Sequence, residues 1–294
     1  MKVGFIGLGR MGSGMAGRIL EAGHDLVVYD VIAESTARAA AAGARVAASV
    51  AELCDGREVV ITMLAEEAAV DAVAFGEGGL CDSLAGDAIH LAMGTYGIGT
   101  IRALAAAHSA ARQVLVAAPV LGRPDLAAAG QLGIVTAGPD EAVGRCEPLF
   151  KIIGRLTFHA GKEPEAASAV KLANNLVLGC AIQAMGEAFS LVRRYDVRPQ
   201  VLYDVMTEGL FSAPAYKVYG KIIVDESYAR AGSTISLNLK DANLIIAAGD
   251  IARVPLPGGN TFRDRLLSAI AHGDADKDVA ALALEQARAC GLES

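Results

Sequence analysis

The sequence has 294 residues, of which 53% are hydrophobic and 20% are charged, a composition typical of a globular protein long enough for two domains. A formal net charge of −7 argues against a nucleic-acid partner, because phosphate binding requires clustered Lys and Arg side chains. Five scattered cysteines without a CxxC pair predict no metal site, and the lack of a secretion signal or a membrane-length apolar run leads us to expect a cytoplasmic protein without a membrane partner.

Short β-rich runs alternate with Ala-rich helical segments from residue 1 to about residue 160. This alternation predicts βαβ units on a largely parallel sheet, and therefore a doubly wound α/β Rossmann domain over residues 1–162. The alanine run at residues 39–42 is expected to be helical. The predicted strands read KVGFIG, DLVVYD, EVVITML, AIHLAM, QVLVAAP, LGIVTAG and RLTFHA.

The pattern changes after Gly161, where one long helix is predicted over residues 163–194. We therefore expect an all-helical domain for substrate binding and oligomerisation over residues 163–294. A helix this long needs a partner along much of its length, so we expect it to bridge the domains and to pack against a second subunit in a homodimer or homotetramer. Further helices are predicted near residues 198–207, 214–224, 237–252, 260–272 and 277–289.

The strongest local signal is a GxGxxG motif between the first strand and a helix predicted over residues 13–21. In such a motif Gly7 permits a tight turn, Gly9 lets the backbone approach a pyrophosphate, and Gly12 lets the helix pack close to the strand. The helix N-terminus then supplies amide donors to the phosphates. The alternative is a glycine turn in an unrelated α/β protein. The other predicted contacts from this turn are Leu8, Arg10 and Met11.

Asp30 ends the second predicted strand, about 20 residues beyond the motif, as the dinucleotide-binding pattern requires. A carboxylate there accepts hydrogen bonds from the ribose hydroxyls and repels a 2′-phosphate. No Lys or Arg follows within the next few residues. The predicted cofactor is therefore NAD(H), with NADP(H) less favoured.

The segments GFIGLGRMGSGMA and AGHDLVVYD closely resemble the N-terminal signature of the β-hydroxyacid dehydrogenase family. The resemblance continues through residues 118–120, 171–175 and 240–241 to Gly273, Asp274 and Asp278. It implies an oxidoreductase that acts on small hydroxy acids or related carbonyl compounds.

The same resemblance implies cofactor contacts outside the glycine turn. Met63 and Leu64 would border the adenosine half of the cofactor, and Thr95 would lie near the nicotinamide ribose. Lys240 would reach the nicotinamide and substrate region. The alternatives are a strand-end apolar pair, a loop threonine and a solvated Lys–Asp pair.

Lys171, Asn174 and Asn175 share one face of the long helix, because residues three and four apart are neighbours there. Hydride transfer from an alcohol requires the hydroxyl proton to leave, and an amine on a rigid helix can accept it. The resemblance implies that Lys171 is the general acid/base and that Asn175 orients the substrate, with Asn174 beside it. A lysine extended along an exposed helix face is the alternative. Phe211 is expected to close over the substrate or to pack in the core.

The substrate loop departs from the family pattern, which reads approximately Ala-Pro-Val-Ser-Gly-Gly. Here Val120 is followed by Leu121, Gly122 and Arg123, so the serine hydroxyl is absent. Arg123 could bind a carboxylate in a bidentate manner instead, or it could be a surface arginine.

Three functions follow from these patterns. The first is an NAD(H)-dependent enzyme that interconverts a small β-hydroxy acid and its semialdehyde. The second is a reductase of neutral aldehydes, ketones or imines on the same scaffold, suggested by Leu121. The third is a dinucleotide-binding module without catalysis.

Overall fold

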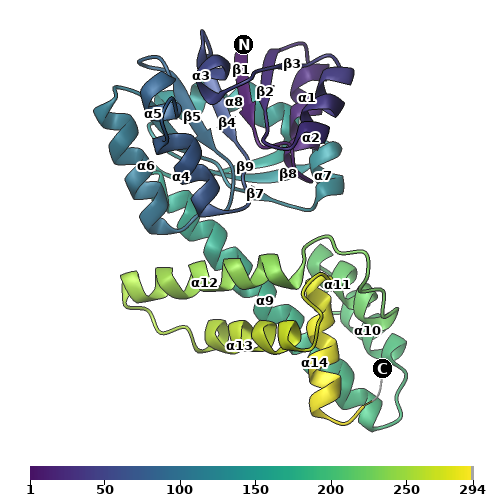
Figure 1. The fold of residues 1–294 in the computed structure, drawn as a ribbon. Coiled ribbons are helices and arrows are strands. Elements are labelled where there is room, and N and C mark those ends of the chain that lie inside the picture. Colours follow the sequence, from purple (N-terminus) through teal and green to yellow (C-terminus); the bar gives the residue numbers. More distant parts are fainter. Residues whose placement is uncertain (293–294) are drawn as a thin grey trace. The chain divides into compact units, whose positions relative to one another are not determined.

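The computed structural model describes residues 1–292, and its contacts divide the chain into two compact units that meet inside one long helix, at Lys171 and Leu172 (Figure 1). The first unit contains one nine-stranded sheet with helices on both faces. Its strands are β1 (Lys2–Ile6), β2 (Asp25–Tyr29), β3 (Arg45–Val46), β4 (Val59–Thr62), β5 (Ile89–Ala92), β6 (Val114–Ala117), β7 (Val120–Leu121), β8 (Leu132–Ala137) and β9 (Gly154–Gly161). Its helices are α1 (Gly12–Glu21), α2 (Ala33–Ala41), α3 (Val50–Cys54), α4 (Glu67–Phe75), α5 (Leu80–Ser83), α6 (Ile98–Ala110), α7 (Pro124–Ala128) and α8 (Asp140–Ile153).

The strand order is β3-β2-β1-β4-β5-β6-β8-β7, with β9 paired to β8. The strands from β3 to β6 are parallel, and β8 runs antiparallel to β6 and β7. The order reverses between β1 and β4, and open α/β sheets bind ligands at the carboxyl ends of strands flanking such a reversal. The doubly wound fold predicted from the sequence is confirmed.

The central strands β1, β4 and β5 are buried on both faces, which explains why they are continuously apolar instead of alternating, whereas β9 at the edge of the sheet is largely exposed. Val3 and Phe5 of β1 pack toward α1 and α8, and Ile6 packs toward α3 and α5. Helix α1 contacts α2, α7 and α8 on one face, and α4 contacts α5 and α6 on the other. This double covering leaves only the strand ends and the loops for ligand binding.

The long helix α9 (Glu165–Arg194) enters the second unit, which is all-helical in the part of the chain that is described. Its core packs Ile182 and Phe189 of α9 against Phe262 and Leu266, with Leu282 alongside. The other elements are α10 (Pro199–Glu208), α11 (Pro214–Val224), α12 (Ile235–Ala252), α13 (Pro257–Ala271), the 3₁₀ turn η1 (Val279–Ala281) and α14 (Leu282–Ala289).

Two of the predicted helices begin elsewhere. The helix expected from residue 260 begins at Pro257, because proline suits the first helical position. The helix expected over 277–289 is instead η1 followed by α14, since the Asp278 side chain caps the 3₁₀ turn by accepting from the Ala280 amide. The two-residue strands β3 and β7 were not predicted, because a hydrophobic period cannot be recognised in two residues.

One helix, α9, is long and apolar enough by length and composition to cross a membrane, with a mean hydropathy of 1.4 in its most apolar window. The core helix of a protein without any membrane segment passes the same test.

Candidate active site

The glycine turn after β1 has the geometry that its sequence predicts. Gly7 has φ +97°, and its amide donates to Tyr29 O at 3.0 Å, which ties the turn to β2. A Cβ on Gly12 would lie 1.9 Å from Gly7 O, so only glycine lets α1 start this close to the turn. A Cβ on Gly9 would meet no protein atom within 4 Å, so the backbone of Gly9 borders open space. The turn therefore has room for a phosphate at the residue where the motif requires it. Of the side chains between these glycines, Leu8 is buried, Met11 is half-buried and Arg10 is exposed.

Asp30 is tied to the same turn. One of its carboxylate oxygens accepts from the Leu8 amide at 2.5 Å, and the other accepts from the Ile32 amide at 2.8 Å. A carboxylate has about four acceptor positions, so two amide donors leave capacity for the hydroxyls of a ribose.

The remaining predicted cofactor residues follow the next strands of the sheet. Strand register places Ile6 beside Thr62, and Thr62 beside Ala92, so Met63, Leu64 and Thr95 leave the sheet at the edge that carries Gly7. Met63 and Leu64 touch the turn directly, because a Cβ on Gly7 would lie 2.5 Å from Met63 O and 2.9 Å from Leu64 Cδ2. The first unit thus brings the glycine turn, Asp30 and these residues together.

The altered substrate loop lies in the first unit as well. Val120 is buried, and Leu121 of β7 pairs with Gly133 of β8. Gly122 has φ +146°, and Arg123 is the half-buried N-cap residue of α7. Leu121 therefore belongs to a short strand, and its backbone leads directly into the arginine.

A second polar cluster lies on α9 and α12. Asn175 Nδ2 donates to Asp241 Oδ2 at 2.8 Å, and Lys240 Nζ lies 3.0 Å from Asp241 Oδ1. The side chains of Lys240 and Asp241 are only 16% and 14% exposed, so this is a largely desolvated pair and not the solvated pair considered above. Lys171 lies one helical turn before Asn175, on the same face of α9 and next to the exposed Asn174.

Two functional candidates escaped the sequence reasoning. In the sequence Asp241 stands out only as part of a Lys-Asp dipeptide, whereas the structure places it between Asn175 and Lys240. No sequence pattern points to Tyr96, whose buried hydroxyl accepts from the Leu64 amide at 3.3 Å. Both contacts join segments that lie far apart in the sequence, so no local signal could have found them.

The aromatic residues near residue 211 divide between surface and core. Phe211 is 45% exposed, and its ring lies 5.0 Å from the ring of Tyr216. Tyr219, by contrast, is 7% exposed and packs in the core of the second unit. Phe211 therefore keeps the accessible surface that a substrate contact requires.

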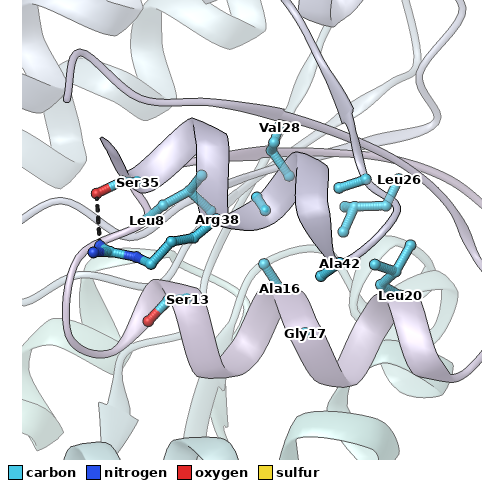
Figure 2. Close-up of a pocket in the computed structure, with 12 residues that line it drawn as sticks. Leu8, Ser13, Ala16, Gly17, Leu20, Leu26, Val28, Ser35, Arg38 and Ala42 are labelled. Carbon is cyan, nitrogen blue, oxygen red and sulfur yellow. Dashed lines mark hydrogen bonds between the residues drawn. The ribbon is translucent and has the colours of Figure 1, made fainter. Parts of the chain in front are cut away.

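A cavity of about 280 Å³ lies between α1 and α2 (Figure 2). It is largely apolar, with Leu20, Leu26 and Val28 among its walls, and Arg38 donates to Ser35 at 3.3 Å toward one end. The cavity lies over β2 between the two helices, and Leu8 of the glycine turn is among its lining residues.

Two family models together match most of the chain. Residues 2–161 match the model of the NAD-binding domain of 6-phosphogluconate dehydrogenase. Residues 166–285 match the model described as NAD-binding of NADP-dependent 3-hydroxyisobutyrate dehydrogenase. The chain belongs to the β-hydroxyacid dehydrogenase family. It is accordingly an NAD(P)-dependent oxidoreductase acting on CH–OH groups.

Relatives within this family align over nearly the whole chain. An uncharacterised oxidoreductase, YfjR of Bacillus subtilis, is 37% identical, over 96% of this chain and 98% of its own length. The 3-hydroxyisobutyrate dehydrogenase of Pseudomonas aeruginosa is 32% identical, over 94% of each chain. A solved Mycobacterium tuberculosis 3-hydroxyisobutyrate dehydrogenase with L-serine has a TM-score of 0.88 at 25% identity, over 96% of this chain and 98% of its own.

Proposed function

We propose that this dehydrogenase interconverts a small β-hydroxy acid and its semialdehyde, with NAD(H) as cofactor and Lys171 as general acid/base. The observation that carries the proposal is the polar cluster in which Asp241 holds Asn175, one helical turn from Lys171 on α9. A largely buried Asn–Asp–Lys arrangement on core helices costs desolvation, and such groups are concentrated at functional sites.

Each side chain of the cluster has a distinct role. Because Asn175 Nδ2 donates to Asp241, the amide is held in one orientation, and its Oδ1 faces away from the carboxylate to accept from the substrate hydroxyl or the Lys171 ammonium. Lys171 accepts the hydroxyl proton during oxidation and returns it during reduction. The glycine turn and Asp30 would hold NAD, which would supply the hydride acceptor for the oxidation.

A substitution separates this role from an effect on folding. Replacing Lys171→Ala should leave NADH affinity unchanged and lower kcat by several orders of magnitude, because the proton then has no positioned acceptor. Lys162→Ala is the matched control, since that lysine is 74% exposed and pairs with Asp140. Turnover retained in Lys171→Ala would overturn the assignment.

The preference for NAD(H) over NADP(H) rests on Asp30. Its carboxylate borders the turn and would repel a 2′-phosphate, and residues 31–33 are Val-Ile-Ala, without a cation to bind one. Parallel fluorescence titrations with NADH and NADPH test this preference. Tighter binding of NADPH would contradict it.

An acidic substrate is supported by Arg123, whose guanidinium follows directly on the loop that carries Leu121. The relatives described above include 3-hydroxyisobutyrate dehydrogenases, one of them solved with L-serine, which is a β-hydroxy acid. We would measure NADH oxidation with glyoxylate, succinic semialdehyde, methylmalonate semialdehyde and neutral aldehydes. Turnover confined to the acids supports the proposal, whereas turnover of the neutral compounds favours the second function, for which the apolar Leu121 argues. No turnover with any substrate would leave only the cofactor-binding module.

We further propose that the enzyme is cytoplasmic and acts as a homodimer or homotetramer that buries the apolar surface of α9. Val177 and Leu191 are 68% and 60% exposed, and Tyr195, just after the helix, is 77% exposed. Light scattering after size exclusion should give two or four times the mass of 30.1 kDa. A monomeric mass would contradict this part of the proposal.

A further inference from the structure

Helix α6 begins without a cap of its own. Its N-cap residue is Gly97, which has no side chain to accept from the first amides of the helix. Three residues later, where a capping box has Glu or Gln, the chain has Thr100. The start of α6 therefore depends on a partner from another part of the chain.

Glu67, the first residue of α4, is that partner. Its Oε1 atom accepts from the Gly97 amide at 2.8 Å and from the Thr100 hydroxyl at 2.5 Å. These donors are 30 and 33 residues away from Glu67 in the sequence. One carboxylate oxygen thus joins the N-cap residue and the third residue of α6, as a capping box does, but from a neighbouring helix. The negative charge also suits this place, because it lies at the N-terminal ends of both α4 and α6.

The segment before α4 fixes the loop that leads into α6. This loop, residues 93–97, follows β5. The Leu64 amide donates to the Tyr96 hydroxyl at 3.3 Å. A Cβ on Gly94 would lie 2.4 Å from the same hydroxyl oxygen and 2.7 Å from Leu64 O, so glycine is needed where the two segments meet. Met93 and Tyr96 are 1% exposed, which leaves Thr95 as the partly exposed side chain of the loop.

The place of β5 in the sheet indicates which half of a dinucleotide this loop would meet. The strand order reverses between β1 and β4, with β2 on one side and β5 on the other. A dinucleotide spans such a reversal, with one mononucleotide half on each side. Asp30 follows β2, on the side proposed for the adenosine ribose, so the loop after β5 lies on the nicotinamide side.

We propose that Glu67 is a positioning residue for the nicotinamide half of the cofactor, which acts by capping α6 and so holds the loop 93–97 in the conformation that presents Thr95. The inference rests on the proposed cofactor site. Without the carboxylate, this loop would become ordered only when the cofactor binds, and that ordering would lower the affinity. The adenosine half should be insensitive to the change, since the glycine turn and Asp30 lie across the reversal.

The experiment compares two ligands of the full-length protein. NADH has both halves of the dinucleotide, whereas ADP has only the adenosine half with both phosphates. Glu67→Ala should raise the NADH Kd roughly tenfold, the effect of losing a charged hydrogen bond. The ADP Kd should stay within about twofold of the parent value, because the contacts of the adenosine half are intact. Fluorescence titration gives the first constant, and isothermal titration calorimetry gives the second.

Three further variants separate capping from a general effect of the substitution. Glu67→Gln keeps a carbonyl oxygen that can accept from both donors, so its NADH Kd should rise less than about threefold. Thr100→Val removes one donor and keeps the carboxylate, and it should raise the NADH Kd roughly three- to fivefold. Glu66→Ala is the matched control, because this neighbouring glutamate is exposed and its side chain caps no amide. It should bind both ligands as the parent protein does.

The two ligands distinguish positioning from a general loss of structure. A rise in the NADH Kd of Glu67→Ala without a rise in the ADP Kd, and its rescue in Glu67→Gln, support the proposal. Equal losses for NADH and ADP, or unchanged NADH binding, would overturn it. If thermal melts show that Glu67→Ala does not fold, Thr100→Val gives the same comparison of ligands. A parent protein that bound none of NADH, NADPH and ADP would refute the cofactor site itself, whereas a parent that binds them beside variants that do not discriminate would refute only the positioning role.

Discussion

A methyl group on Gly9 should weaken cofactor binding without disturbing the fold. A Cβ at this position meets no protein atom within 4 Å, and Gly9 does not have the positive φ that favours glycine. The free energy of unfolding of Gly9→Ala should therefore change by less than about 0.5 kcal/mol. A pyrophosphate needs the space that the methyl would fill, so the NADH Kd should rise at least tenfold, or about 1.4 kcal/mol.

Gly12→Ala should have the opposite profile. Its Cβ would lie 1.9 Å from Gly7 O and 3.0 Å from Gly7 C. Because these are backbone atoms, the clash can be relieved only if α1 moves away from the turn. Overpacking of this kind costs roughly 1–3 kcal/mol, and backbone partners place Gly12→Ala near the upper limit. The melting temperature should then fall by roughly 5–10 °C.

Gly17→Ala in the middle of α1 is the control, because a Cβ there also meets nothing within 4 Å. It should stabilise the protein by about 0.5–1 kcal/mol through helix propensity and leave NADH binding unchanged. Thermal melts and NADH fluorescence titrations on the three variants provide both measurements. Undiminished NADH binding by Gly9→Ala would refute the assignment of this turn to the cofactor.

Three further predictions concern the rest of the chain. Asp241→Asn should lower kcat roughly 10- to 100-fold with an unchanged NADH Kd, because the acceptor that holds Asn175 loses its charge and one of its two oxygens. Asp250→Asn on the exposed side of α12 should have no effect, and equal losses in both variants would argue against a specific role. Stability should fall as the pH is lowered from 7.5 to 5.5, since burial holds the folded pKa of His90 well below its unfolded pKa and the unfolded chain gains the proton first. Urea unfolding at the two pH values measures this loss, and a flat profile would contradict the buried neutral ring. Ala39→Leu should raise the free energy of unfolding by about 1–2 kcal/mol, because the larger side chain fills the cavity between α1 and α2. Thermal melts measure this change, and a lower melting temperature would show that the cavity cannot accept the side chain.

Local patterns were sufficient for much of the fold. Each strand of four or more residues in the first unit was predicted. Continuous apolar runs between turns mark the central strands, which are buried on both faces, whereas β9 is largely exposed. The geometry of the glycine turn and its contact with Asp30 could also be predicted, since the dinucleotide-binding pattern depends on backbone freedom and on a fixed spacing along one βαβ unit. Lys171 and Asn175 came from helix periodicity together with the family resemblance.

Contacts between segments that are distant in the sequence could not be predicted from local patterns. Asp241 joins Asn175 across 66 residues, and Tyr96 reaches Leu64 across 32. No period or spacing along the chain records either contact, because each depends on which helix or loop packs beside which.

The sequence by itself therefore determined the family, the doubly wound domain, the long helix and the turn that suits a dinucleotide. Only the tertiary structure decided which partners surround those residues. It placed the Asp241 carboxylate beside Asn175, and it joined Gln113, His108, His90 and Thr62 by buried hydrogen bonds. The physical reason is that a motif is encoded by neighbours along the chain, whereas the orientation of a buried amide or imidazole is set by donors and acceptors that only folding brings within 3 Å.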